Sequence, residues 1–305
     1  MKIVVTGGKG FLGRNVVKKL EEKDHEVESC SRSSGVDIRD YAAIYEYLKK
    51  SKPDLVVHCA AHVGGIAYND LKPVEIFEDN LKIGMNIVKA TAEAKVPKLV
   101  NIMPNCTYPG ELNIYKEDQW WDGPMHETVL TYGLPRKVMW GLTWAYKKKG
   151  LLDAAHLVFP NMYGPYDHFD PVRSHALGAL IVKIIEAKKK GQDKVEIWGT
   201  GKPVREWLYV EDGAESILKT IEHFDEIGID ILNIGVGKGV TITEMAELIR
   251  EAVAWEGEFV YLKDRPDGAM IKVIEAKRMK KILDWEPPTE IRDGIKKTVE
   301  WYLKQ

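Results

Sequence analysis

The chain has 305 residues, with 44 Lys and Arg against 46 Asp and Glu and a formal net charge of −2. This length can bury a large core in one big domain or in two joined domains. The balanced charge, with no basic stretch interleaved with aromatic residues, excludes a nucleic-acid-binding protein. No apolar run approaches the roughly 20 residues that span a bilayer, so we expect no membrane association.

Cysteine usage and the N-terminus favour a cytoplasmic protein. Cys30, Cys59 and Cys106 show neither a disulfide-like spacing nor a metal-ligand spacing. Unpaired cysteines are typical of proteins in a reducing compartment. The chain begins directly with a strand pattern, so we expect no signal peptide.

The first predicted element is an apolar strand over 2–6, followed at once by a glycine-rich turn and an amphipathic helix. Glycine allows a tight turn, lets the backbone approach a diphosphate and packs the helix close to the sheet. The start of the helix offers free N–H groups to an anion. This order of strand, turn and helix favours a dinucleotide site over an ordinary glycine turn. The residues expected at this site are Gly7, Gly10, Phe11, Leu12 and Gly13.

The end of the second predicted strand, 26–30, indicates which dinucleotide binds. An acidic residue at this position usually holds the ribose of NAD. Here Arg32 stands among serines, and a guanidinium with hydroxyls suits a 2′-phosphate, so NADP(H) is favoured over NAD. The alternative is a solvated loop arginine. Asp37 and Ile38 either border the adenine or belong to a plain turn.

Strand and helix patterns then alternate, with strands over 55–61, 98–103 and 154–159 and helices over 73–94 and 131–146. This alternation predicts an α/β fold with a doubly wound parallel sheet. After Pro160 the elements become shorter and predict a smaller mixed α/β substrate domain. Strand patterns over 207–210 and 231–234 predict that the chain returns to the sheet. We therefore expect a cofactor domain over 1–160, with a returning segment over about 205–235, and a substrate domain in the rest of 161–305.

Several longer motifs are more specific than the glycine turn. They are Val63-Gly64-Gly65-Ile66, Cys106-Thr107-Tyr108-Pro109, Asn161-Met162-Tyr163-Gly164-Pro165, Ser174-His175, Trp198-Gly199-Thr200-Gly201-x-Pro203-x-Arg205-Glu206 and Pro266-Asp267-Gly268. Together with the Ala60-Ala61 strand end and a basic residue four positions after Tyr132, they resemble the GDP-L-fucose synthase family of extended short-chain dehydrogenase/reductases. The resemblance covers essentially the whole chain.

The resemblance implies an NADP-dependent enzyme that epimerises a GDP-4-keto-6-deoxyhexose at C3 and C5 and reduces its 4-keto group. Cys106 and His175 match the two proton-transfer residues, and a thiol and an imidazole suit proton shuttling near neutral pH. Tyr132 matches the residue that protonates the C4 oxygen. Ala60 and Ala61 match cofactor contacts, and a homodimer through the helices over 73–94 and 131–146 is implied.

Two positions depart from the family pattern. Pro104 replaces the usual catalytic serine or threonine and has no hydroxyl to donate. Arg136 replaces the usual lysine, which binds the nicotinamide ribose and lowers the tyrosine pKa. Arginine keeps the charge but is wider and never gives up its proton. Lys137 is adjacent, but one residue turns about 100° around a helix, so we expect it to point elsewhere.

These departures leave three hypotheses open. In the first, Asn105 or Thr107 supplies the missing donor, Arg136 supplies the charge, and reduction survives at a lower rate. In the second, the redox step is lost or repurposed and the protein performs another sugar modification with bound NAD(P). The third is a non-catalytic protein that binds nucleotide sugars.

The substrate side is carried over position by position from the same resemblance. The matching residues are Asn161, His175, Lys183, Trp198, Arg205 and Asp267. A lysine or an arginine can hold a diphosphate, the arginine in bidentate fashion. The long connection over 109–128 is a candidate substrate lid.

Overall fold

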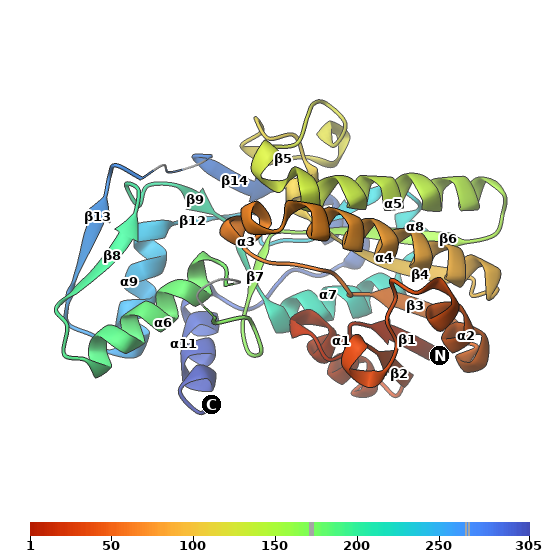
Figure 1. The fold of residues 1–305 in the computed structure, drawn as a ribbon, viewed down its shortest axis with the longest axis horizontal. Coiled ribbons are helices and arrows are strands. Elements are labelled where there is room, and N and C mark those ends of the chain that lie inside the picture. Colours follow the sequence, from red (N-terminus) through yellow and green to blue (C-terminus); the bar gives the residue numbers. More distant parts are fainter. Residues whose placement is uncertain (171–173, 266, 268) are drawn as a thin grey trace.

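The computed structural model describes residues 1–170, 174–265, 267 and 269–305. Its centre is a six-stranded, all-parallel sheet with strand order β11-β6-β4-β3-β1-β2 (Figure 1). The strands are β1 Lys2–Thr6, β2 Glu26–Cys30, β3 Leu55–His58, β4 Lys98–Pro104, β6 Asp153–Phe159 and β11 Ile231–Asn233. This order confirms the predicted doubly wound α/β fold.

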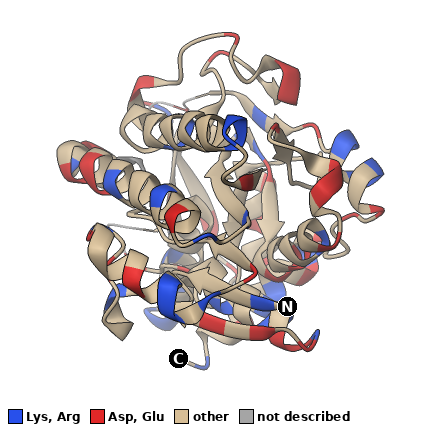
Figure 2. Cartoon of the chain, turned by 90° about the vertical axis from the view of Figure 1, so that its right-hand side faces the viewer, with Lys and Arg blue, Asp and Glu red and all other residues tan. Residues whose placement is uncertain are grey.

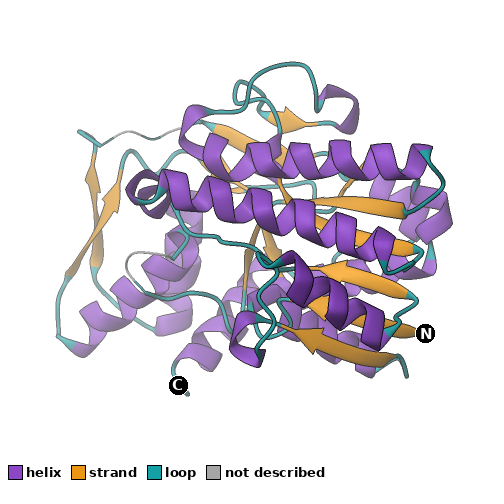
Figure 3. Cartoon of the chain, turned by 45° about the vertical axis from the view of Figure 1, so that its right-hand side comes forward, coloured by secondary structure: helices purple, strands orange, loops and turns teal. Residues whose placement is uncertain are grey.

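Helices cover both faces of this sheet. One face packs against α1 Phe11–Glu21, α7 Val210–Glu222 and α10 Lys277–Leu283. The other face packs against α2 Tyr41–Ser51, α4 Pro73–Glu93 and α5 Leu130–Lys148. The two long helices α4 and α5 run side by side over the sheet (Figure 3). Both faces are therefore covered, as the continuous apolar strand patterns predicted.

The remaining elements surround a third core cluster at the other end of the molecule (Figure 1). They include the helices α6 Ala176–Lys189, α9 Ile242–Val253 and α11 Ile291–Tyr302. Their strands form three small sheets: β7 Asn161–Tyr163 with β10 Trp207–Tyr209, β8 Lys194–Trp198 with β13 Glu258–Leu262, and β12 Val240–Thr241, β9 Val204–Arg205, β14 Ile271–Ile274 and β5 Ile114–Tyr115. Two short helices, α3 Ile66–Leu71 and α8 Phe224–Ile227, complete the fold.

One predicted strand lies in a different sheet. The pattern over 231–234 does return to the central sheet, where β11 pairs with β6. The pattern over 207–210 does not, because β10 pairs in parallel with β7 outside the central sheet. A three-residue apolar strand carries no local signal for its partner, so its pairing depends on tertiary packing.

The segment over 109–128 is built into the structure rather than hinged over it. Its strand β5 pairs with β14, and the Trp120 side chain is buried with only 2% of its surface exposed. The Trp120 indole donates to the Thr107 hydroxyl at 2.9 Å, and the Lys137 ammonium donates to the Trp120 carbonyl. The lid prediction is therefore wrong for this segment as the structure shows it.

Glu206 joins the two ends of the molecule through a buried carboxylate. Its Oε1 accepts N–H bonds from Val236 and Gly237, and its Oε2 accepts one from Ile274. Burial raises the pKa of Glu206 to about 7, against the opposing effect of these three donors. Glu206 itself lies between β9 and β10. Its carboxylate therefore connects three parts of the chain: the β9–β10 junction, the segment after β11 and the strand β14.

Charged residues of both signs are interspersed on the face shown in Figure 2. No single-sign surface dominates that view, which agrees with the balanced composition. Within the described ranges, no helix combines the length and the apolarity needed to cross a bilayer.

Candidate active site

The glycine turn lies between β1 and α1, and its geometry requires glycine at two positions. Gly7 has φ +70°, and an added Cβ would lie 2.9 Å from the Ala60 Cα atom. A Cβ at Gly13 would lie 2.2 Å from the Gly7 carbonyl oxygen. Gly10 is the N-cap of α1, and no side chain of the described residues caps this helix. The turn therefore packs against the end of β3 and leaves the first amides of α1 open to an anion.

The helix residues beside this turn pack inward. Leu12 is buried, and Phe11 is partly buried against the same core cluster. Their side chains anchor α1, so their backbone amides are what the site offers to a diphosphate. Ala61 follows Ala60 in the loop after β3 and is half-buried.

In the loop after β2, Arg32 is exposed to solvent and Asp37 forms an ion pair with Arg39. Arg32 is exposed in a short 3₁₀ turn whose N-terminus is closed by a capping box between Ser31 and Ser34. The Asp37 carboxylate is paired with Arg39 at 2.6 Å, and this pairing lowers the pKa of Asp37. The Ile38 side chain is only 4% exposed and belongs to the core, so only its backbone is available to border an adenine.

Tyr132 and Arg136 lie one helical turn apart on α5. The Arg136 guanidinium carbon lies 5.5 Å from the centre of the Tyr132 ring, and its Nη2 donates to the Asn80 side-chain oxygen at 3.2 Å. Burial raises the pKa of Tyr132, and the Arg136 charge lowers it. Arg136 thus meets the electrostatic part of the role that the family gives to lysine.

Lys137 points away from this pair, as the helical geometry predicted. Its ammonium lies between the rings of Trp120 and Trp121, 4.7 and 4.4 Å from their centres. Burial lowers the pKa of Lys137 to about 8. This lysine anchors the 109–128 segment and does not replace the missing active-site lysine.

The structure distinguishes between Asn105 and Thr107, the two residues expected to supply the hydrogen-bond donor that Pro104 lacks. The Thr107 hydroxyl is fully buried, donates to the Pro104 carbonyl and accepts from Trp120. It cannot also serve a substrate, so this part of the prediction is wrong. Asn105, in the turn Asn105–Thr107, makes no side-chain hydrogen bond to any described residue and remains the candidate donor.

Cys106 lies among cations drawn from both ends of the molecule. Burial raises the pKa of its thiol to about 12, while the charges of Lys272 and Arg136 lower it. Lys272 lies on β14, in register with Arg205 on β9, and burial lowers the pKa of Lys272. Sequence reasoning missed Lys272 because no local motif contains it. Only the pairing of β14 brings it to the site.

His175 is the N-cap residue of α6 and is partly buried. Burial lowers its pKa, and a nearby charge on His168 lowers it further, so the imidazole is neutral at pH 7. Across the described residues, no hydrogen bond joins its side chain to Cys106, Tyr132 or Arg136. The structure therefore places His175 on a separate element from the other proposed proton-transfer groups.

The predicted substrate residues fall into two groups. Arg205 is half-buried, with its Nη1 donating to the Val204 carbonyl at 2.9 Å, and burial lowers its pKa. The Asn161 amide reaches the Glu206 carbonyl at 3.5 Å. Lys183 and Trp198 are exposed, and Trp198 lies 5.5 Å below the Arg265 guanidinium.

Asp267 is held by the turn that follows β8. It accepts hydrogen bonds from the Thr200 amide at 2.6 Å and the Thr200 hydroxyl at 2.7 Å, which lower its pKa. The neighbouring motif residues Pro266 and Gly268 lie outside the described residues. A direct substrate contact by Asp267 remains a prediction.

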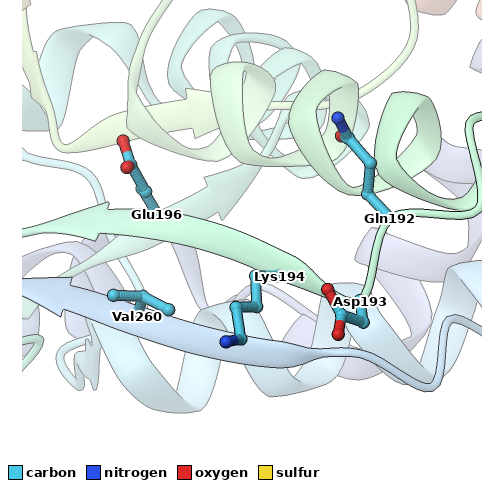
Figure 4. Close-up of a pocket in the computed structure, with 5 residues that line it drawn as sticks. All are labelled: Gln192, Asp193, Lys194, Glu196 and Val260. Atoms are coloured by element: carbon cyan, nitrogen blue, oxygen red, sulfur yellow. The ribbon is translucent and has the colours of Figure 1, made fainter.

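A surface depression lies away from these residues. It lies on the β8–β13 pair and is lined by Gln192, Asp193, Lys194, Glu196 and Val260 (Figure 4). These side chains project in different directions and do not converge (Figure 4). None is a predicted site residue. No group of described residues has the composition of a metal site.

Comparisons with known proteins show which enzymes this chain is similar to. A GDP-L-fucose synthase from Azorhizobium caulinodans is 33% identical over 303 residues, which is 99% of this chain and 96% of the relative. A GDP-L-colitose synthase from Yersinia pseudotuberculosis is 33% identical, over 100% and 99% of the two chains. A solved GDP-L-fucose synthetase from Naegleria fowleri bound to NADP is 25% identical with a TM-score of 0.88, covering 99% of this chain and 92% of that one.

The predicted resemblance to the GDP-L-fucose synthase family is thereby confirmed. The family model described as the NAD dependent epimerase/dehydratase family matches residues 3–235. Its range includes the glycine turn, Cys106, Tyr132 and Arg136. The chain therefore belongs to the NAD dependent epimerase/dehydratase family.

Proposed function

We propose that this protein is an NADP(H)-dependent enzyme that converts a GDP-linked 4-keto-6-deoxyhexose by epimerisation at C3 and C5 and reduction at C4. The observation that carries the proposal is the placement of Tyr132, Arg136 and Cys106 at one site. The names of the full-length relatives, both synthases of GDP-linked sugars, support the substrate class. They favour catalysis over the binding-only and redox-silent alternatives.

The cofactor site fits a dinucleotide on its own geometry. The Gly7–Gly13 contact leaves no room for a side chain, so a diphosphate could approach the backbone at the start of α1. Arg32 is exposed at the end of β2 and would meet a 2′-phosphate. NADP(H), when bound, supplies the hydride for C4. The relative from Naegleria fowleri is solved with NADP bound, which supports the same choice here.

The reaction divides between two sets of residues. The substrate's 4-keto group acidifies the hydrogens on C3 and C5, and Cys106 and His175 remove and return those protons. Burial keeps the Cys106 thiol protonated, against the opposing charges of Lys272 and Arg136, so Cys106 can return a proton, while the neutral His175 can accept one. Tyr132 donates its proton to the C4 oxygen, and the Arg136 charge stabilises the phenolate that remains.

The sugar nucleotide would lie between the two ends of the molecule. Asn161, Lys183, Trp198 and Asp267 belong to the proposed substrate domain in 161–305, and Arg205 lies where that domain meets the returning segment. Residues 1–160, with the returning segment over about 205–235, form the proposed cofactor domain. The separate core clusters at the two ends support this division.

The proton-transfer assignment is tested by solvent exchange. In ²H₂O, the wild type is expected to wash deuterium into both C3 and C5 of the 4-keto substrate. Cys106→Ala and His175→Ala are each expected to lower exchange at one or both carbons by about 10²–10⁴-fold, the usual effect of losing one proton-transfer group. Exchange is measured by mass spectrometry and proton NMR.

Cys30→Ala is the matched control, because Cys30 is a buried thiol beneath α2. It is expected to leave exchange unchanged. Full exchange in both Cys106→Ala and His175→Ala would show that other residues move these protons.

We also propose that the protein is a cytoplasmic homodimer. The three free cysteines suit a reducing compartment. The outer faces of α4 and α5 expose Met85, Val138 and Trp144, with 47%, 40% and 44% of their surfaces accessible. Two copies of this helix pair could bury these apolar side chains against each other.

Trp144→Glu is expected to convert the dimer to a monomer in sedimentation velocity, because it places a charge in the proposed interface. Leu303→Glu is the control, since Leu303 is 56% exposed on the C-terminal segment. A dimer that persists in Trp144→Glu, or a monomeric wild type, would rule out this interface.

A further inference from the structure

A row of buried polar side chains crosses the central sheet beneath α4 and α5. Thr6, His58, Asn101 and His156 are register partners on the neighbouring strands β1, β3, β4 and β6. Each has at most 1% of its surface exposed. These four polar side chains occupy matching positions on four neighbouring strands, where apolar side chains would ordinarily pack. None of them belongs to the site described above.

At the β6 end of the row, hydrogen bonds determine which atoms donate and which accept. The Thr143 hydroxyl, on α5, donates to the Trp140 carbonyl at 2.7 Å and can therefore accept from His156 Nε2 at 3.0 Å. His156 Nδ1 is then the acceptor for the Asn101 amide nitrogen at 3.3 Å. This orientation leaves the Asn101 oxygen free to accept from another donor, and none of the described residues supplies one.

The β1 end fixes the tautomer of His58 in the same way. The Thr6 hydroxyl accepts from the Ala60 amide at 3.4 Å, and His58 Nδ1, at 2.8 Å, is the one acceptor that the described residues offer its own hydrogen. His58 Nε2 then carries the hydrogen and is a donor. Burial lowers the pKa values of His58 and His156 to about 3, so both rings are neutral at physiological pH.

Three buried atoms in this region have no hydrogen-bond partner among the described residues: His58 Nε2, the Asn101 oxygen and Arg136 Nε. His58 and Asn101 lie in register on adjacent strands. Arg136 lies seven residues before Thr143 on α5, on the helix face that reaches the row at His156, and its charge further lowers the pKa of His58. Buried polar atoms without partners destabilise the folded state.

We infer that one ordered water molecule is bound between Arg136 Nε, His58 Nε2 and the Asn101 oxygen, and that it positions the Arg136 guanidinium. The donors and acceptors match, because a water can accept from the two N–H groups and donate to the amide oxygen. Arg136 is then held at two nitrogens, by Asn80 at Nη2 and by this water at Nε. His58 and Asn101 act through Arg136 and are positioning residues.

This arrangement explains how an arginine is accommodated where the family has a lysine. A lysine side chain has no N–H group equivalent to the arginine Nε, so a lysine at this position would not donate to the inferred water beneath the helix. The polar row supplies that acceptor from below the helix. The kinetic part of this inference rests on the proposed function, whereas the structural part does not.

The structural test is a crystal structure of the full chain at a resolution that shows ordered water. A water within about 3.2 Å of all three atoms is expected. In His58→Leu, which keeps a similar volume, the water is expected to be lost and the Arg136–Asn80 bond broken. Three atoms that remain unbridged in the wild type, or an unmoved Arg136 in His58→Leu, would overturn the inference.

The kinetic test is a double-mutant cycle on NADPH oxidation. His58→Leu and Asn101→Leu are each expected to lower kcat about tenfold with KM changed less than twofold. In an Arg136→Met background the same changes are expected to have less than a twofold effect. Thr91→Val, a buried hydroxyl on α4 that bonds only within its helix, is the control for general destabilisation.

Equal losses in both backgrounds would show that His58 acts on stability and not through Arg136. A wild type with no turnover would count against the proposed function alone. The crystallographic result would still decide whether the water and its effect on Arg136 are present.

Discussion

Replacing Tyr132 with phenylalanine is expected to lower the rate of keto reduction by about 10²–10⁴-fold, because the phenol is the only group proposed to transfer a proton to the C4 oxygen. The ring would stay in place, since the Arg136 guanidinium packs against its face. NADPH binding is therefore expected to change less than about threefold. Single-turnover oxidation of NADPH, with binding followed by nucleotide fluorescence, separates the two effects.

Tyr146→Phe provides the comparison on the same helix. Tyr146 is only half-buried near the C-terminal end of α5, beyond the buried turns that carry Tyr132 and Arg136. Its loss is expected to leave reduction unchanged. Equal rates for Tyr132→Phe and the wild type would exclude Tyr132 as the proton donor and favour a reaction without reduction.

Gly13→Ala is expected to remove cofactor binding and to destabilise the fold. The new Cβ would lie 2.2 Å from the Gly7 carbonyl oxygen and 2.8 Å from its carbon, so backbone must move against backbone. Overpacking of this kind typically lowers the free energy of unfolding by about 1–3 kcal/mol. A displaced turn is expected to weaken NADPH binding at least tenfold, which corresponds to about 1.4 kcal/mol. Calorimetry and chemical denaturation measure the two effects.

Gly141→Ala is the opposite case and the natural control. Gly141 lies in the interior of α5, and an added Cβ would meet no atom within 4 Å. Removing glycine from a helix interior is expected to stabilise the protein by about 0.5–1 kcal/mol without affecting NADPH affinity. If Gly13→Ala retained wild-type affinity, the turn at α1 would not be the diphosphate site.

The cofactor end of the molecule could be predicted from local patterns. The strand, the spaced glycines and the helix follow one another within residues 2–21, so their chemistry is visible in a short window. The central strands are apolar runs covered on both faces, which periodicity detects directly. Helix geometry alone predicted that the Lys137 side chain points away from Arg136.

The residues that could not be predicted depend on contacts between distant segments. Lys272 reaches Cys106 only because β14 pairs with β5 and β9, and a pairing partner has no local signal. Asn80 lies within an ordinary helix pattern, and only the packing of α4 on α5 shows that it holds Arg136. The Thr107 hydroxyl is available in sequence but already used in the structure, since Trp120 and Pro104 occupy it.

The Glu206 carboxylate has a consequence for how substrate is admitted. Its three amide donors come from the segment after β11 and from β14, so a hinge rotation of one end of the molecule against the other would strip a buried anion of its partners. Hydrogen bonds to a charged group are worth about 1.5–3 kcal/mol each, which makes such a rotation costly. We therefore expect an activated sugar to be admitted by local rearrangement of side chains and loops, while the two ends of the molecule keep their spacing.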